Sequence, residues 1–317
     1  MNDLSFFAKK LLNEQNLALI CHVRPDGDTL GSALALKTAL IKVGKKAEVY
    51  CADPVPERFF FIDEFRTVKS ELASDYQAVV SIDCADVTRL GTFQSLFIEK
   101  INTYNLDHHV SNNGYGKVNY VVDRASNCEN VYWLIKEMGI ELDQKIASLL
   151  MVGIITDTSI FRHKNTTPET LKIAGELLEL GAPLNEIQYN MYYKQTKNRA
   201  KLLGLVASKI RYFYDEQIAI ATVFKSQIEE SGAKEDETEG FIDFVMGIDT
   251  VKIGICLLEM DNGFYKVSLR SKGADVNAVA RMFGGGGHTL ASGCKIKGEY
   301  EEIVDKLRFA SYQYLEE

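Results

Sequence analysis

The first half of the chain alternates short apolar runs with amphipathic stretches. The apolar runs, which predict strands, occupy residues 17–23, 47–51, 78–82, 101–106 and 118–122. Helical periodicity marks residues 30–43, 130–137, 144–155 and 168–180. The last of these begins with Thr167 as a potential N-cap and Pro168 at the first helical position. Such alternation predicts an α/β fold with a parallel sheet and helices on both faces.

The second half has a different pattern. Residues 183–210 are helical in periodicity, and strand patterns follow at residues 217–224, 251–260 and 264–270. The turn Asp261-Asn262-Gly263 between the last two runs predicts a hairpin. The acidic stretch 229–239 is interpreted as a solvated loop and helix start, without a function. The predicted organisation is a parallel-sheet domain over 1–182, a helical connector over 183–205, and a smaller α/β domain over 206–317.

The net charge of the chain limits the kinds of molecule that it is expected to bind. The 317-residue chain carries a formal net charge of −8 and is otherwise ordinary, with 46% hydrophobic and 25% charged residues. Long duplex nucleic acid is held largely by lysine and arginine on its phosphates, so this acidic chain is not expected to bind it. A phosphate-containing substrate should therefore be small or gripped at a few points.

The sequence shows no pattern of a membrane span or of a signal peptide. The longest nearly uncharged stretch, residues 147–155, is too short to cross a bilayer, and the N-terminus lacks a signal-peptide pattern. The six cysteines are scattered and contain no CxxC pair. A cytoplasmic protein with reduced cysteines and no membrane partner is the simplest expectation.

Four short segments place carboxylates and imidazoles close to the ends of predicted elements. They are residues 22–28 (HVRPDGD), 81–83 (SID), 106–109 (LDHH) and 156–158 (TDT). In an open parallel sheet, ligands bind in the crevice beyond the carboxyl ends of the strands. The first three segments follow predicted strands and should converge there, whereas the fourth ends a helical pattern.

The charge of this cluster predicts metal ions. Four crowded aspartates would raise one another's pKa, and two divalent cations would balance their four negative charges. Neutral histidines add nitrogen ligands, and a mixed set of His and Asp suits manganese, iron or zinc, with manganese the first choice. The predicted cage consists of His22, Asp26, Asp28, Asp83, His108 and Asp157.

Each residue alone has a simpler explanation. An aspartate at a strand end is commonly a helix N-cap or a turn residue, and Asp28 could cap the helix that begins near Leu30. A lone histidine is commonly structural. However, four of the five histidines fall within these segments or the glycine run described next. The joint interpretation as a metal site is therefore favoured.

A glycine run marks the second domain. Residues 284–288 read GGGGH, and consecutive glycines let the backbone approach a ligand and present N–H groups to a phosphate. A flexible loop without a ligand is the alternative. The surrounding polar and basic residues favour a phosphate or nucleotide grip; they are Arg270, Ser271, Lys272, Asn277 and Arg281.

Taken in order, these motifs resemble a known family. HVRPDGD, SID, LDHH, GIITDT and GGGGHTLASG are similar to the motifs of DHH phosphoesterases with a DHH-associated C-terminal domain. The resemblance is greatest to the nanoRNase/pAp-phosphatase branch and extends from residue 17 to about residue 294. It implies a manganese-dependent phosphoesterase that hydrolyses short oligoribonucleotides and 3′-phosphoadenosine 5′-phosphate (pAp) with two metal ions.

The resemblance also implies individual roles. One metal would be held by His22, Asp26 and Asp83; the other would be held by Asp28, Asp83, His108 and Asp157, with Asp83 bridging. Asp107 would orient an imidazole through a hydrogen bond, and His109 would face the substrate, positioning the scissile phosphate or protonating the leaving oxygen. The implied substrate-binding set is Arg270, Ser271, Gly285, Gly286, Gly287 and His288.

Several alternatives stay open at the level of sequence. They are a cyclic-dinucleotide or linear-dinucleotide phosphodiesterase, an inorganic pyrophosphatase, and a non-catalytic nucleotide-binding regulator. Two positions depart from the branch: Ser159 stands where glycine is usual after TDT, and His163 where an aromatic residue is usual. Neither is a predicted ligand, so both bear on substrate preference rather than on the chemistry.

Overall fold

A computed structural model describes residues 3–72 and 76–315 of the chain. It divides into two compact units, Met1–Lys194 and Gln195–Glu317. Residues in the predicted connector form α7 (Leu184–Gln188) and the π-helical turn η4 (Tyr189–Tyr193) of the first unit, and α8 (Lys197–Ala207) of the second. Each unit has its own sheet and core, and the two are described separately.

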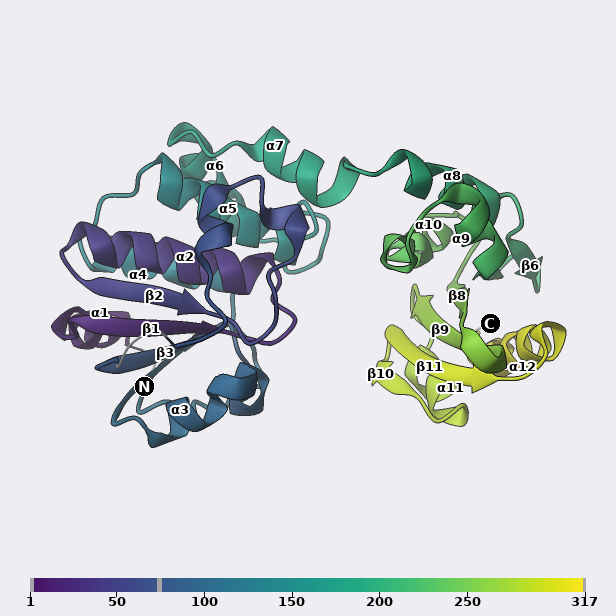
Figure 1. Ribbon diagram of the computed structural model, residues 1–317, viewed down its shortest axis with the longest axis horizontal. Helices are drawn as coiled ribbons and strands as arrows, with labels where there is room; N and C mark the ends of the chain where they lie inside the picture. The colour runs from purple at the N-terminus through teal and green to yellow at the C-terminus, as the bar shows by residue number, and fades with distance from the viewer. Residues whose placement is uncertain (1–2, 73–75, 316–317) are drawn as a thin grey trace. The chain divides into compact units, whose positions relative to one another are not determined.

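The first unit is built on a five-stranded sheet in which every neighbouring pair is parallel (Figure 1). Its strand order is β2-β1-β3-β4-β5. Because the chain moves from β1 outward to β2 and then across to β3, the order reverses between β1 and β3, which makes this a switch point. The strands are β1 (Asn16–Cys21), β2 (Lys46–Tyr50), β3 (Ala78–Ile82), β4 (Asn102–Asp107) and β5 (Val118–Val121).

Helices cover both faces of this sheet, as predicted. Side chains of β1 alternate between two cores: Leu17 and Leu19 pack on one side, and Ala18 and Ile20 on the other. The larger core lies under α1 (Leu4–Asn13), α2 (Gly27–Lys42), α4 (Asn127–Glu137), α5 (Gln144–Asp157) and α6 (Pro168–Glu179). The smaller core lies under η3 (Val87–Phe93) and α3 (Gln94–Glu99), seen below the sheet in Figure 1. The remaining short turns are η1 (Glu57–Phe59) and η2 (Asp63–Thr67).

Glycines allow α2 and α5 to pack unusually closely. A Cβ atom at Gly31 would lie 2.5 Å from the carbonyl oxygen of Leu149, and one at Gly153 would lie 2.7 Å from Oδ1 of Asp28. Such distances are far inside van der Waals contact, so any side chain here would push the helices apart. This packing brings Asp28, in the first turn of α2, beside the C-terminal half of α5.

The second unit contains a six-stranded mixed sheet in the order β10-β11-β9-β8-β7-β6. Only β7 and β8 are parallel among these pairs. The strands are β6 (Arg211–Phe213), β7 (Ile218–Val223), β8 (Ile253–Glu259), β9 (Phe264–Ser271), β10 (Gly286–His288) and β11 (Ala291–Lys297). This smaller α/β arrangement agrees with the fold class predicted for the second half.

Two helical layers pack on this sheet. One core lies under α11 (Val276–Met282) and α12 (Tyr300–Tyr312), and the other under α8, α9 (Lys225–Ser231) and α10 (Phe241–Met246). Two 3₁₀ turns complete the unit, η5 (Glu235–Thr238) and η6 (Asp261–Gly263), the latter joining β8 to β9 at the predicted hairpin.

Two further sequence predictions concern the chain as a whole. All six cysteines lie within the described residues, and none of them forms a disulfide there. Within residues 3–72 and 76–315, no helix has the length and apolar character required to span a membrane.

Candidate metal centre

The carboxyl ends of three parallel strands meet at the switch point of the first sheet. His22 follows β1, Asp83 follows β3, and His108 and His109 follow β4. Asp157 arrives from elsewhere, as the last residue of α5. The six predicted metal ligands therefore come together. His22, Asp83 and His108 follow strands, whereas Asp26 and Asp28 lie at the start of α2 and Asp157 at the end of α5.

The first group of ligands surrounds Nε2 of His22. This nitrogen lies 3.5 Å from Oδ2 of Asp26 and 3.6 Å from Oδ2 of Asp83. The other ring nitrogen, Nδ1, is 2.8 Å from the carbonyl oxygen of Val23, which can accept its proton. That hydrogen bond fixes the tautomer in which Nε2 keeps a free lone pair, as a metal ligand requires.

Asp26 also performs the structural role that the sequence offered as an alternative. Its Oδ1 accepts hydrogen bonds from the backbone N–H groups of Asp28 and Thr29, each 3.1 Å away, and so caps α2. Its Oδ2 faces His22. The two interpretations of Asp26 are compatible because each uses a different oxygen.

The second group surrounds Nε2 of His108. Oδ1 of Asp83 lies 3.3 Å away, Oδ2 of Asp157 lies 3.4 Å away, and Oδ2 of Asp28 lies 3.8 Å away. Nδ1 of His108 donates to the carbonyl oxygen of Arg124 at 3.1 Å. As with His22, a backbone carbonyl holds the proton on Nδ1 and turns Nε2 toward the carboxylates.

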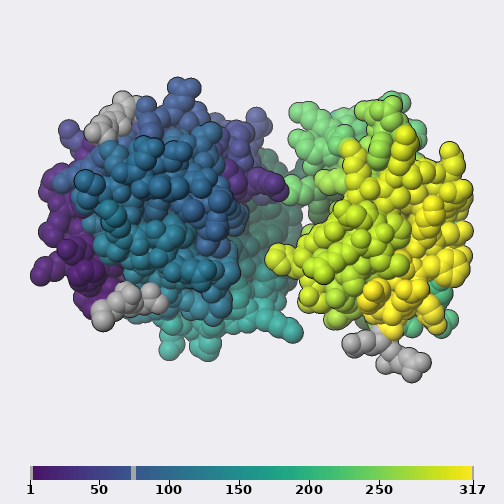
Figure 2. All heavy atoms as spheres, turned by 90° about the horizontal axis from the view of Figure 1, so that it is seen from below, coloured from purple at the N-terminus to yellow at the C-terminus, as the bar shows by residue number. Residues whose placement is uncertain are grey.

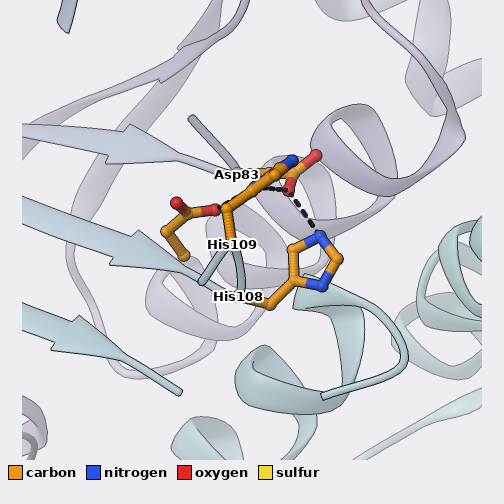
Figure 3. A group of neighbouring side chains, drawn as sticks. Asp83, His108 and His109 are labelled. Atoms are coloured by element: carbon orange, nitrogen blue, oxygen red, sulfur yellow. Dashed lines mark hydrogen bonds and ion pairs between the residues drawn. The ribbon is translucent and has the colours of Figure 1, made fainter. Parts of the chain in front are cut away.

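Asp83 lies between the two groups and faces both with different oxygens. Figure 3 shows it beside His108 and His109. Its side chain is buried, and its backbone adopts the left-handed region with φ of 53°. A non-glycine residue is rarely held there without a compensating interaction, and such strain is typical of functional positions. Its Oδ1 is buried without a hydrogen-bond donor among the described residues, as expected for an oxygen that binds a cation.

Asp28 is held by a helix 100 residues away along the chain. Its carboxylate accepts hydrogen bonds from the backbone N–H groups of Asn127 at 2.5 Å and Cys128 at 2.9 Å, at the start of α4. Ser126, the formal N-cap of α4, makes no capping bond with its side chain. Asp28 thus takes over the cap, and the positive end of the helix dipole stabilises its negative charge.

The pKa values show how this cluster behaves without a cation. Burial raises the pKa of Asp28 to about 7 and, together with the charges of Asp28 and Asp83, that of Asp157 to about 9. Burial opposes protonation of the histidines, but contacts with the aspartates raise the pKa of His22 to about 10 and of His108 to about 11. Protons therefore compensate the crowded carboxylates, in the place that divalent cations would occupy.

His109 belongs to a separate chain of hydrogen bonds. Its Nδ1 lies 2.8 Å from Oδ1 of Asp107, whose Oδ2 accepts a 2.6 Å hydrogen bond from Asn112. Hydrogen bonding to Asp107 raises the pKa of His109, and the ring is about one-third exposed, unlike its neighbour His108. A half-buried imidazole with a fixed carboxylate partner can hold a proton toward solvent or substrate.

The predicted substrate residues of the second unit are partly brought together. In the sheet register, Arg270 pairs with Ala291 and Ala291 pairs with His288, so the side chains of these three residues lie on one face. Arg270 also lines a cavity of about 700 Å³ on that face, together with Lys266 and Ser268. The glycine-rich strand lies in the exposed yellow-green region of this unit in Figure 2.

Two parts of the predicted substrate set have local structural explanations. Ser271 alternates to the opposite face from Arg270, and its hydroxyl donates to the carbonyl oxygen of Ala274. A Cβ atom at Gly285 would collide with the backbone of Gly293 and with Cys294, so close packing requires glycine there. Gly286 and Gly287 form strand β10 with His288, where the sequence suggested a loop.

Three contributors to the site are absent from the sequence prediction. Asn112 supports Asp107, the start of α4 binds Asp28, and Arg89 places its Nη2 3.2 Å from Nδ1 of His22. The pattern Ser126-x-x-Glu129 is a helix-start signal that could have located the start of α4. Asn112 and Arg89 carry no such signal because their roles depend on tertiary contacts.

The fold and the clustered ligands define a DHH phosphoesterase. Residues 16–154 match the N-terminal domain of the DHH family, and residues 215–316 match the DHHA1 domain. The chain belongs to this family and is a hydrolase that acts on phosphoester bonds. DHH phosphoesterases use divalent metal ions, and the donor set here fits such ions: acidic and imidazole side chains converge around a buried carboxylate oxygen without a donor.

Proteins similar in sequence to this chain include relatives that are named as enzymes. The bifunctional oligoribonuclease and PAP phosphatase NrnA of Thermus thermophilus is 32% identical over 304 residues, covering 93% of this chain and 90% of the relative. NrnA of Bacillus subtilis is 30% identical over 281 residues, covering 87% of each chain. An exopolyphosphatase-related protein from Bacteroides fragilis has a similar structure, with a TM-score of 0.88, 25% identity, and coverage of 98% of this chain and 96% of that protein.

Proposed function

We propose that this protein hydrolyses short oligoribonucleotides and pAp with two divalent metal ions, with manganese the metal that the mixed His and Asp ligands favour. The observation that carries the proposal is the position of Asp83, whose two oxygens face two separate ligand groups. The activities for which the relatives are named, oligoribonuclease and PAP phosphatase, support the choice of substrates. The two functions share one chemical requirement, an accessible phosphoester at the metal centre.

His22, Asp26 and Asp83 would hold one ion, and Asp28, Asp83, His108 and Asp157 the other. When bound, the ions would supply a water of lowered pKa and neutralise charge on the phosphoryl group. The backbone carbonyls of Val23 and Arg124 keep both imidazoles in the coordinating tautomer. The protein thus presents preformed ligands and avoids reordering them when metal binds.

His109 is proposed as the residue that protonates the leaving ribose oxygen or positions the phosphate. Its Nδ1 is engaged by Asp107, which leaves Nε2 as the atom available to the substrate. The carboxylate of Asp107 favours the protonated imidazole and so keeps a proton ready for the leaving group. Asn112 prevents Asp107 from turning away by binding its second oxygen.

In the second unit, the face that carries Arg270 and His288 is proposed to bind the remainder of the substrate. Arg270 supplies a guanidinium suited to phosphate, and Lys266 adds a second positive charge beside the same cavity. Ser271 and Gly285 would help to form this binding face by stabilising the local backbone, Ser271 through its hydrogen bond to Ala274 and Gly285 through its close packing. Substrates of a few nucleotides suit these limited contacts and the net charge of −8 better than long polymers do. Reduced, free cysteines support a cytoplasmic location.

The proposal is tested by comparing substrates under one condition. With manganese present, rates are measured on a 5′-phosphorylated diribonucleotide, pAp, cyclic di-AMP, inorganic pyrophosphate and a single strand of about 24 nucleotides, which exceeds the length that one small binding domain covers. We expect the diribonucleotide and pAp to be hydrolysed fastest. Exclusive release of phosphate from pyrophosphate, or linearisation of cyclic di-AMP alone, would replace the proposal with the corresponding alternative. Tight nucleotide binding without turnover in any divalent metal would indicate a regulator.

A further inference from the structure

Arg89 is a half-buried cation beside the first ligand group, and the proposed metal chemistry does not use it. It belongs to η3, the segment that follows Asp83. Its guanidinium Nη2 lies 3.2 Å from Nδ1 of His22, but no carboxylate of the described chain forms an ion pair with it. Two other arginines of this unit form ion pairs, Arg124 with Glu169 and Arg66 with Asp63.

The backbone holds Arg89 at this position. Its carbonyl oxygen accepts a 2.8 Å hydrogen bond from the N–H of Val23, and its own N–H donates to Asp86. Gly91, two residues later, has φ of 60°, and a Cβ atom there would lie 2.7 Å from Val23 and 2.8 Å from Ala52. Glycine therefore permits η3 to lie directly against the segment that carries His22.

The contact between Arg89 and His22 cannot be a hydrogen bond when His22 acts as a metal ligand. Metal coordination through Nε2 requires the proton on Nδ1, and that proton is donated to the carbonyl oxygen of Val23. A guanidinium has donors and no acceptor, so Arg89 and Nδ1 then present hydrogens to each other. The guanidinium of Arg89 then has no hydrogen-bond acceptor on His22, and its N–H groups can donate to another group.

Charge balance points to what it would bind. The carboxylates of Asp26, Asp28, Asp83 and Asp157 are compensated by two divalent cations, four charges against four, which leaves the charge of Arg89 uncompensated. A planar guanidinium with paired donors is suited to the oxygens of a phosphoryl group. Arg89 contacts the Nδ1 side of the His22 ring, and Nε2 faces the carboxylates. From there its side chain can turn toward the bound phosphoester once Nδ1 no longer accepts a hydrogen bond from it.

We infer that Arg89 is a phosphate-binding residue of the catalytic unit, which donates to a non-bridging oxygen of the phosphoryl group held at the metal centre. This inference rests on the proposed two-metal function and names a substrate contact that the ligand set does not contain. Arg89 thereby holds the phosphoryl group from the His22 side, while His109 approaches from the β4 side.

The test measures anion and metal binding separately from catalysis. Calorimetric titration of the manganese-loaded full-length protein with inorganic phosphate gives the affinity for a bare phosphoryl group. We expect Arg89→Gln to weaken phosphate binding about 10- to 100-fold, as for the loss of a charge-assisted hydrogen-bonding pair. Arg89→Lys should recover part of the affinity for phosphate, because lysine restores the positive charge but lacks the paired N–H donors of a guanidinium. Arg66→Gln, which removes an arginine of the same unit paired with Asp63, is the matched control.

Metal affinity distinguishes binding from a merely structural role. Because Arg89→Gln removes a positive charge beside the centre, manganese affinity should stay the same or rise. Phosphate affinity within about twofold of wild type would overturn the inference, and so would a roughly tenfold loss of manganese affinity, which would mean that Arg89 only positions His22. If the wild-type protein hydrolyses no phosphoester but Arg89→Gln still loses phosphate, the proposed function fails while the anion site stands.

Discussion

Oδ1 of Asp83 lies 3.3 Å from Nε2 of His108, while its Oδ2 lies 3.6 Å from Nε2 of His22. One buried carboxylate thus connects two sets of ligands that come from three strands and two helices. The left-handed backbone at Asp83 directs the side chain into this position at the end of β3. The arrangement depends on packing around it as much as on the ligands, and substitutions can separate the two contributions.

The close packing of α2 and α5 should control the position of Asp28. Gly153→Ala would place a methyl group against Cys128 and 2.7 Å from Oδ1 of Asp28, so the helices must separate. We expect a loss of about 1–3 kcal/mol in the free energy of unfolding and weaker manganese binding. Urea unfolding and metal titration measure the two effects.

Gly175→Ala is the matched control for this substitution. Gly175 also lies within a helix, α6, but a methyl group there would meet no atom within 4 Å beyond its own helix backbone. Alanine there should raise the free energy of unfolding by about 0.5–1 kcal/mol because it favours the helix. Equal effects of the two substitutions would show that the α2–α5 contact does not constrain the site.

Asp107 should act through His109 rather than through metal binding. Asp107→Asn keeps the shape of the side chain but removes the charge that favours protonated His109. We expect the rate of dinucleotide hydrolysis to fall about 10²-fold with little change in manganese affinity, the usual scale for general acid catalysis. The double variant Asp107→Asn/His109→Ala should hydrolyse the dinucleotide no more slowly than His109→Ala alone. Independent, multiplicative losses in the double variant would contradict a shared pathway.

Ser159 should carry backbone strain that glycine would relieve. Ser159, Ile160 and Phe161 follow Asp157 with successive φ values of 47°, 59° and 59°. The left-handed conformation costs a non-glycine residue about 1–2 kcal/mol. Ser159→Gly should therefore raise the midpoint of urea unfolding, offset in part by the lost contact with Arg162. A lower midpoint would mean that contacts of the serine side chain outweigh the strain.

Glu129 should make the stability of the first unit depend on pH. It is buried in α4, its Oε1 has no hydrogen-bond partner among the described residues, and burial raises its pKa despite Thr170 and Arg124. A carboxyl with a raised pKa in the folded state favours folding at low pH. That contribution is lost as the pH rises from the unfolded-state pKa through the raised folded-state pKa. Glu129→Gln should therefore gain stability relative to wild type as the pH increases.

Fluorescence provides the measurement for Glu129. Trp133, the single tryptophan of the chain, lies in the same helix and reports unfolding of this unit. Urea unfolding is compared at pH values of about 5 and about 8, both above the ordinary pKa of a glutamate. Glu179→Gln, at an exposed position of α6, is the control and should show no such trend. An unchanged difference between wild type and Glu129→Gln at the two pH values would exclude a titrating Glu129.

The sequence was sufficient for features that depend on local patterns. Apolar runs predicted the strands that end at His22, Asp83 and His108, and the rule for parallel sheets predicted their convergence. It could not reveal that Asp28 caps α4, because the residues involved are 100 positions apart. Nor could the sequence show that residues 286–288 form an edge strand, because glycine is unfavourable in strands. These residues form a strand through their pairing with β11. Arg89 has a role only through its contact with His22.

The most direct test of the central claim is replacement of the shared carboxylate, Asp83→Ala, with manganese stoichiometry and hydrolysis of a 5′-phosphorylated diribonucleotide measured on the same preparation. If Asp83 serves both ligand groups, the variant should bind fewer than two ions and lose at least about 10³-fold in rate, because both ions stabilise the same transition state. Circular dichroism confirms that the variant is folded. A correctly folded Asp83→Ala protein that binds two manganese ions and retains near wild-type activity would contradict the account.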